Sequence, residues 1–166
     1  MLINKYNNHI SINLENGTVI LYDSIEDKKN TLCIDFKAIS SVTENAMVIS
    51  NPGEYEIFSI ITRVSKTQNV FISVEGIKIS YISNTSELID SKDIDSGDII
   101  IFDINNGSSA KMEDIIKIEK DIQPKVLIIN SSIENLTHVD TYEKVSKLKI
   151  KKNELDLIVD TKMYLM

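Results

Sequence analysis

The sequence predicts a mixed α/β (α+β) fold, a sandwich with mixed sheets inside and helices outside. The first half of the chain consists of alternating strand patterns separated by turn residues, whereas the second half alternates short continuous apolar runs with helical spacing. The apolar content is mostly Ile, Val and Leu, with 6% aromatic residues and no Trp, which favours a sheet-rich core. At this length we expect residues 1–166 to form a single domain.

Two tight turns identify hairpins in the first half. Asn16 and Gly17 separate two alternating runs, and both residue types tolerate the positive φ of a type I′ turn. Glu75 and Gly76 separate a second pair of runs in the same way. The strands expected in this half cover residues 9–14, 18–22, 32–36, 46–50, 54–64, 69–74 and 77–82.

The stretch over residues 48–57 is the strongest local signal. A short apolar strand runs into Pro52 and Gly53 and leaves in the long alternating run 54–64. Pro52 presets φ for the first turn position, and Gly53 supplies the positive φ that the next position needs. We therefore expect a fixed structural turn between two sheet strands at Pro52 and Gly53.

The second half predicts a βαβ unit. Residues 98–103 and 125–129 are continuous apolar runs typical of strands covered on both faces. Between them, residues 112–122 have helical spacing, and Pro124 ends that helix. A parallel strand pair with a right-handed crossover follows. A second helix over 138–147 and strands over 148–150, 155–159 and 163–165 complete the expected elements.

Charge and cysteine content limit the possible partners and compartments. The net charge of -7 argues against a nucleic-acid surface, and we interpret the basic run 147–152 as the polar face of a strand rather than a phosphate site. The single cysteine, Cys33, fits a reducing compartment and a buried structural thiol. No signal-peptide pattern and no apolar run of about 18 residues occurs, so a soluble, cytoplasmic protein without a membrane segment is expected.

The segment Ser50-Asn51-Pro52-Gly53-Glu54-Tyr55-Glu56 resembles a Ser-Gly-Pro-Gly-Glu-Tyr-Glu signature in the lactonase-like hydrolase branch of the metallo-β-lactamase superfamily. Three later stretches resemble that branch in the same order, and the resemblance covers roughly residues 46–166. These stretches are Val74-Glu75-Gly76-Ile77-Lys78-Ile79, Ile122-Gln123-Pro124-Lys125-Val126-Leu127-Ile128 and Leu148-Lys149-Ile150-Lys151-Lys152-Asn153-Glu154-Leu155. The resemblance implies an αββα sandwich, here reduced in size.

The resemblance also implies that the metal ligands of the family are lost. The family's metal site uses a His-x-His-x-Asp-His segment together with further His and Asp residues, whereas this chain has two histidines in all, His9 and His138. Tyr81 and Asn84 stand where the family has His and Asp, and Ser131 stands where it has His. We therefore expect no metal, no cofactor and no catalytic residue, with a vestigial pocket lined by these three residues.

Three functional hypotheses follow. The first is a degenerate, catalytically inactive protein (a pseudoenzyme) that serves as a binding, scaffolding or assembly module for an unknown protein partner or for a second copy of itself. The alternative is a hydrolase with a divergent metal site around Cys33, Asp35, Tyr81 and Asn84. A nucleic-acid-processing enzyme is the weakest of the three, because of the net charge of -7 and the missing ligands.

Overall fold

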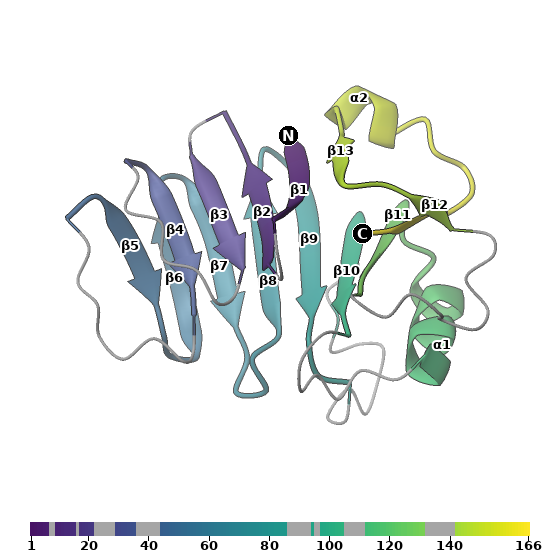
Figure 1. Ribbon diagram of the computed structural model, residues 1–166, viewed down its shortest axis with the longest axis horizontal. Helices are drawn as coiled ribbons and strands as arrows, with labels where there is room; N and C mark the ends of the chain where they lie inside the picture. Colours follow the sequence, from purple (N-terminus) through teal and green to yellow (C-terminus); the bar gives the residue numbers. More distant parts are fainter. Residues whose placement is uncertain are drawn as a thin grey trace.

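Two β-sheets stacked face to face make up most of the fold (Figure 1). The computed structural model describes residues 1–6, 9–15, 17–21, 29–35, 44–85, 94, 97–104, 112–131 and 142–166. The first sheet has the order β13 (Lys147–Lys149), β1 (Leu2–Tyr6), β2 (His9–Asn13), β3 (Thr18–Leu21), β4 (Thr31–Ile34), β5 (Ala46–Ile49). The second has the order β12 (Glu143–Lys144), β14 (Lys162–Leu165), β11 (Val126–Asn130), β10 (Ile99–Asp103), β9 (Ile77–Ile82), β8 (Val70–Val74), β7 (Ile60–Val64), β6 (Gly53–Ile57).

The main core lies between the sheets, because alternate residues of each strand point to one face. Ile3, Ile12, Ile79, Ile101 and Ile128 are buried there, each at most 1% exposed. The mixed sheets match the sandwich predicted from the sequence.

The outer face of the second sheet is covered at one end by α1 (Met112–Ile122). Ile115 and Ile118 of this helix belong to the same apolar cluster as Phe102 and Leu127 of the sheet. The helix has the predicted bounds, and β10 pairs in parallel with β11, so the predicted βαβ unit is confirmed. A second short helix, α2 (Lys152–Leu155), lies beside β13 (Figure 1).

The Pro-Gly turn carries the chain from one sheet to the other. It connects β5, the last strand of the first sheet, to β6, the edge strand of the second. Gly53, the first residue of β6, has φ of 157°, a value that L side chains rarely adopt. Glu75 and Gly76 also have positive φ, of 55° and 72°, in the predicted hairpin between β8 and β9.

The single strand predicted over 54–64 is wrong. The structure has two antiparallel strands there, β6 and β7, joined by Phe58 and Ser59. Both turn residues have positive φ, of 55° and 61°, as a type I′ turn requires. The alternating pattern continues through the turn without Gly, Asn or Asp, so the sequence carries none of the usual turn signals.

Ser59→Gly is expected to stabilise the protein by about 1 kcal/mol, because glycine adopts positive φ without the steric cost of a Cβ atom. Urea unfolding measures the change. Ser73→Gly, in the interior of β8, is the matched control and is expected to lower stability, since glycine weakens a regular strand. A loss of stability in both variants would contradict the strained-turn interpretation.

Two further predictions are wrong, and one strand was not predicted. Glu143 and Lys144 form β12, so the helix expected over 138–147 is wrong in its described part, while residues 138–141 lie outside the described residues. The strand expected over 155–159 is also wrong, because Leu155 ends α2 and the residues after it form turns and irregular structure. Residues 2–6 form β1, a strand that the sequence analysis did not predict.

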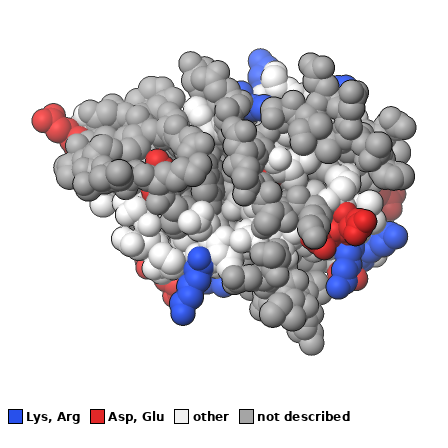
Figure 2. Space-filling model, turned by 60° about the horizontal axis from the view of Figure 1, so that its bottom comes forward, with Lys and Arg blue, Asp and Glu red and all other residues white. Residues whose placement is uncertain are grey.

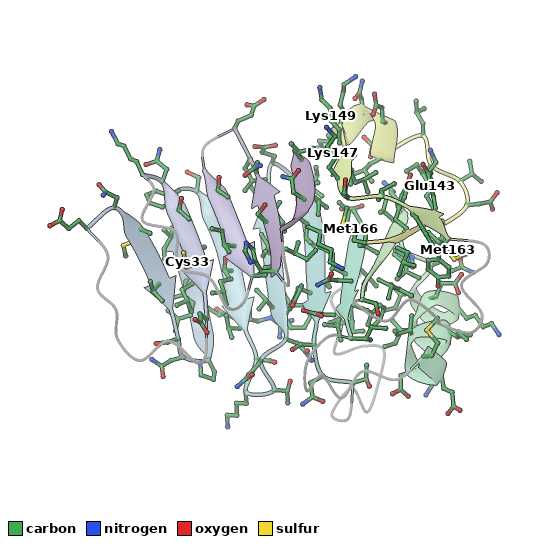
Figure 3. All side chains as sticks on the ribbon, in the orientation of Figure 1. Cys33, Glu143, Lys147, Lys149, Met163 and Met166 are labelled. Atoms are coloured by element: carbon green, nitrogen blue, oxygen red, sulfur yellow. The ribbon has the colours of Figure 1, made fainter. Side chains whose placement is uncertain are left out.

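Lysines of the basic run lie on the surface as predicted. Lys147 and Lys149 of β13 are exposed, while Leu148 between them packs against the main core (Figure 3).

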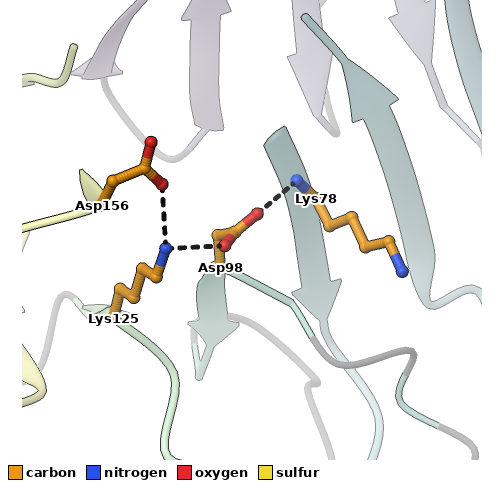
Figure 4. Close-up of polar contacts among 4 residues, drawn as sticks. All are labelled: Lys78, Asp98, Lys125 and Asp156. Atoms are coloured by element: carbon orange, nitrogen blue, oxygen red, sulfur yellow. Dashed lines mark hydrogen bonds and ion pairs between the residues drawn. The ribbon is translucent and has the colours of Figure 1, made fainter. Parts of the chain in front are cut away.

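Asp98 accepts a 3.0 Å hydrogen bond from the Lys78 backbone N–H and lies 3.5 Å from Lys125 Nζ (Figure 4). These surface contacts hold the amino-terminal ends of β9, β10 and β11 together and contribute little individually.

Candidate functional site

The carboxyl ends of many strands meet at one edge of the sandwich. In the first sheet β1, β3, β4 and β5 run in the same direction, and in the second β9, β10, β11 and β14 do. Lys5 near the end of β1 contacts Ser131 just after β11, so the two sets end at the same edge. This is the lower edge of Figure 1, and such strand ends are where α/β sheets commonly place a site.

Polar side chains replace the apolar core at this edge. Tyr81, Asp103 and Asn130 follow Ile79, Ile101 and Ile128 by two positions on neighbouring strands, so they share the face that looks toward the first sheet. Tyr81 and Asn130 are fully buried, and Asp103 is 8% exposed. Buried polar side chains therefore lie between the two sheets at the ends of these strands.

Lys5 extends toward these buried polar side chains from the first sheet. Ile3, two residues earlier in β1, lies in the main core, and Lys5 extends the same face toward the strand end. Its Nζ donates a 2.8 Å hydrogen bond to the Ser131 carbonyl oxygen. Burial lowers the pKa of Lys5, and the nearby Asp103 carboxylate partly opposes that shift.

The Tyr81 hydroxyl donates a hydrogen bond to Oδ2 of Asp103. We call Lys5, Tyr81, Asp103 and Ser131 the strand-end cluster. It combines a cation, a carboxylate, a hydroxyl donor and a backbone acceptor, and it spans both sheets. Tyr81 donates to the buried carboxylate, while Lys5 lies near that carboxylate and donates to the Ser131 carbonyl oxygen.

The structure brings two of the three predicted pocket residues into this cluster. Tyr81 contributes its hydroxyl, and Ser131 contributes its carbonyl oxygen. Asn84 lies just beyond β9, where the buried Asn69 side chain accepts from its backbone N–H at 3.1 Å and donates to its carbonyl oxygen at 2.9 Å. Asn69 also accepts from the Ser83 N–H at 3.1 Å, so it fixes the backbone that leaves β9.

Cys33 and Tyr81, two residues of the alternative metal site, lie in different parts of the fold. Cys33 is buried with Ile20 and Ala46 in a cluster separate from the main core (Figure 3). Tyr81 belongs to the main core between the sheets. Asp35 follows β4 and extends its pairing, its N–H donating to the Ile49 carbonyl at 3.1 Å.

His9 is not part of the strand-end cluster. His9 begins β2 and is 5% exposed, and strand alternation places it on the face of the first sheet opposite Ile10. His138 lies outside the described residues. Within the described ranges no group of three or more His, Cys, Asp or Glu side chains is placed to hold a metal ion.

The strand-end cluster does not fit the metal site that the fold family implies. Zinc and similar ions require nitrogen, sulfur or carboxylate ligands. Here one carboxylate, Asp103, already accepts from Tyr81 and faces the positive charge of Lys5. A second cation beside Lys5 would be repelled by its ammonium group at close range. We therefore derive no metal-dependent step from this site.

Sequence reasoning missed Lys5 and Asp103. The signal was present in Leu2-Ile3-Asn4-Lys5-Tyr6, where a lysine shares the face of a core isoleucine if the segment is a strand. Asp103 closes the continuous apolar run of β10, a position that by itself indicates only the end of a strand.

Comparison with solved structures identifies the fold. The chain is similar to a crystal structure from Thermotoga maritima of a protein assigned to the Zn-dependent hydrolases of the metallo-β-lactamase superfamily. The TM-score is 0.75 at 16% sequence identity, and the match covers 100% of this chain and 98% of that one. No protein-family model and no curated protein matches the sequence. The chain thus has a metallo-β-lactamase-like fold, as the resemblance implied.

The surface at the strand-end edge carries charges of both signs (Figure 2). The space-filling view toward the strand-end edge shows both basic and acidic side chains among the described residues (Figure 2). No helix in the described part of the chain is long and apolar enough to cross a membrane.

Proposed function

We propose that this chain is a metal-free, catalytically inactive metallo-β-lactamase-fold protein that acts as a binding, scaffolding or assembly module. The observation that carries the proposal is the internal bonding of the strand-end cluster. Tyr81 donates to Asp103, and Lys5 donates to Ser131, so groups at the strand ends bind each other.

Metal-assisted hydrolysis requires an ion with an open coordination position that activates water. The strand-end cluster supports the opposite arrangement, since Tyr81 is fully buried and Asp103 nearly so. The groups at this edge are suited to holding the two sheets together, which leaves the outer surface of the domain for interactions. Its partner is a protein, either a different one or a second copy, in the cytoplasm. The net charge of -7 favours a protein partner over nucleic acid.

Metal content of untagged protein purified without chelators tests the proposal. We expect less than roughly a tenth of an equivalent of any transition metal, the background level beside a stoichiometric site. We also expect no hydrolysis of lactone, β-lactam or phosphodiester substrates, with or without added Zn²⁺ or Mn²⁺. One or two equivalents of metal, or turnover that depends on metal, would overturn the proposal. Light scattering of the same sample then separates self-association from binding to another protein.

A further inference from the structure

We propose that copies of this chain join head to tail, with the outer edge of β6 in one copy pairing antiparallel with the outer edge of β13 in the next. This inference rests on the proposed function and names its partner as a second copy of the same chain. The two edges lie at opposite ends of the molecule. β6 is the last strand of the second sheet, at the left of Figure 1, and β13 is the last strand of the first sheet, toward its right.

The first argument is the direction of the backbone groups in β13. In an antiparallel pair, alternate residues bond to the partner strand, and the residues between them point their N–H and C=O groups away. The Ser146 carbonyl oxygen and the Ile150 N–H bond to the segment that contains β1, at 3.0 and 3.1 Å, and Leu148 lies midway between them. The backbone groups of Lys147 and Lys149 therefore point away from β1. In the described part of the chain, no backbone hydrogen bond to another element occupies them.

The outer edge of β6 has the same arrangement. Ile57 and Ile60 flank the turn between β6 and β7, and such a turn commonly has a hydrogen bond between its first and last residues. Alternation then directs the backbone groups of Glu54 and Glu56 away from β7. Among the described residues, these groups too make no backbone hydrogen bond to another element. Each edge therefore presents alternate residues whose donors and acceptors are open to another strand.

The second argument is the charge on these alternate residues. Glu54 and Glu56 are exposed on β6. Lys147 and Lys149 are exposed on β13. Antiparallel pairing that sets Glu54 opposite Lys149 also sets the other glutamate opposite the other lysine, so opposite charges meet in both cross-strand pairs. Pairing of β6 with β6, or of β13 with β13, would instead bring like charges together, which opposes contact between like edges.

The third argument is the residue between the charges on each strand. Tyr55 in β6 and Leu148 in β13 are partly buried, and both pack against the main core of their own copy. In the same register Tyr55 lies opposite Leu148, on the face of the sheet that looks toward the core. An aromatic and an aliphatic side chain in a cross-strand pair stabilise the pairing. The joined sheets therefore continue both a charged outer face and an apolar inner face.

The contact is heterologous, because each copy offers one edge of each kind. Such contacts build rings or open filaments rather than symmetric dimers. The paired segments are short, so the association is weak and grows with protein concentration.

Charge reversal followed by sedimentation equilibrium tests this inference. We expect the average mass of wild type to rise with concentration, and the association constant to fall at least about fivefold when NaCl is raised from about 0.05 M to about 0.5 M. Glu54→Lys/Glu56→Lys has basic side chains on both edges, and Lys147→Glu/Lys149→Glu has acidic side chains on both edges. Each variant alone should be monomeric. A mixture of the two should associate again, because each β6 edge then meets a β13 edge of opposite charge.

Glu113→Lys/Asp121→Lys is the matched control, since it makes the same change in net charge as the β6 variant but on exposed positions of α1. It should associate like wild type. Wild type that stays monomeric at every concentration would overturn the inference, as would association of either charge-reversed variant alone or a mixture that stays monomeric.

If a charge-reversed variant does not fold, hydrogen exchange of wild type decides. Protection of the Glu56 and Lys147 amides that rises with protein concentration supports the inference, and exchange that is independent of concentration contradicts it. Metal-free, inactive protein that stays monomeric would defeat this inference and leave the proposed function intact. Stoichiometric metal would instead defeat the proposed function itself, so the two failures are distinguishable.

Discussion

Replacing Tyr81 with alanine is expected to destabilise the protein by about 4 kcal/mol, because the change opens a cavity at a fully buried position and removes the donor to Asp103. Urea unfolding measures the loss. An effect of this size would be a large part of the total stability of a domain of this length.

The conservative variant separates the two contributions. Tyr81→Phe keeps the ring and removes only the hydroxyl, and we expect a loss of about 2 kcal/mol, since a hydrogen bond to a buried carboxylate is lost. Tyr55→Phe is the matched control, because the Tyr55 hydroxyl donates at the surface to the Asn51 carbonyl oxygen at 2.8 Å. Its cost should stay within about 0.5 kcal/mol. Equal effects of the two substitutions would mean that the Tyr81 hydroxyl contributes nothing special to the cluster.

Lys5→Met is expected to cost about 2 kcal/mol when unfolding is measured in EDTA. Lys5 is only partly buried, so the expected cost is that of one hydrogen bond from a charged donor. The loss arises because the variant cannot donate to the Ser131 carbonyl oxygen. A loss within about 0.5 kcal/mol would contradict this contribution of the hydrogen bond.

The pH dependence of this effect has a defined sign. The pKa of Lys5 is lowered from 10.5 in the folded protein, so at alkaline pH the unfolded chain binds the additional proton. The lowered pKa stabilises the folded protein relative to the unfolded chain above pH 10.5. This stabilisation is lost as pH falls through the pKa that Lys5 has in the folded protein. The difference in unfolding free energy between wild type and Lys5→Met should accordingly grow as pH rises toward 10.5. Other titrating groups are common to both proteins and cancel in the difference.

The sequence was most informative where local chemistry and the tertiary fold agree. The apolar runs around β10 and β11, with the helix ended by Pro124, have one simple arrangement, and the structure adopts it. The hairpin at Glu75 and Gly76 carries its own turn signal. Phe58 and Ser59 carry none, and their positive φ is imposed by the pairing of β6 with β7.

The site was less predictable because it depends on contacts between residues far apart in the chain. Tyr81 and Ser131 were identified through the family resemblance, and both belong to the strand-end cluster. Lys5 was not, since its contact with Ser131 spans 126 positions and requires both sheets to be in place. The strand predicted over 155–159 is wrong for a related reason. Its residues do not pair with another strand, and Leu157 and Val159 are exposed.

The pairing of β1 with β13 has a consequence for the order of events during synthesis. Leu2 is opposite Lys149, and the Met1 amino group donates to the Ile150 carbonyl oxygen at 3.2 Å. A ribosome therefore releases β1 long before β13, because Leu2 and its partner Lys149 lie far apart in the chain. Until then the outer edge of β1 has no neighbour in the nascent chain, and an open strand edge is prone to wrong pairing. Chaperone dependence should consequently be concentrated in the period before residues 147–149 emerge.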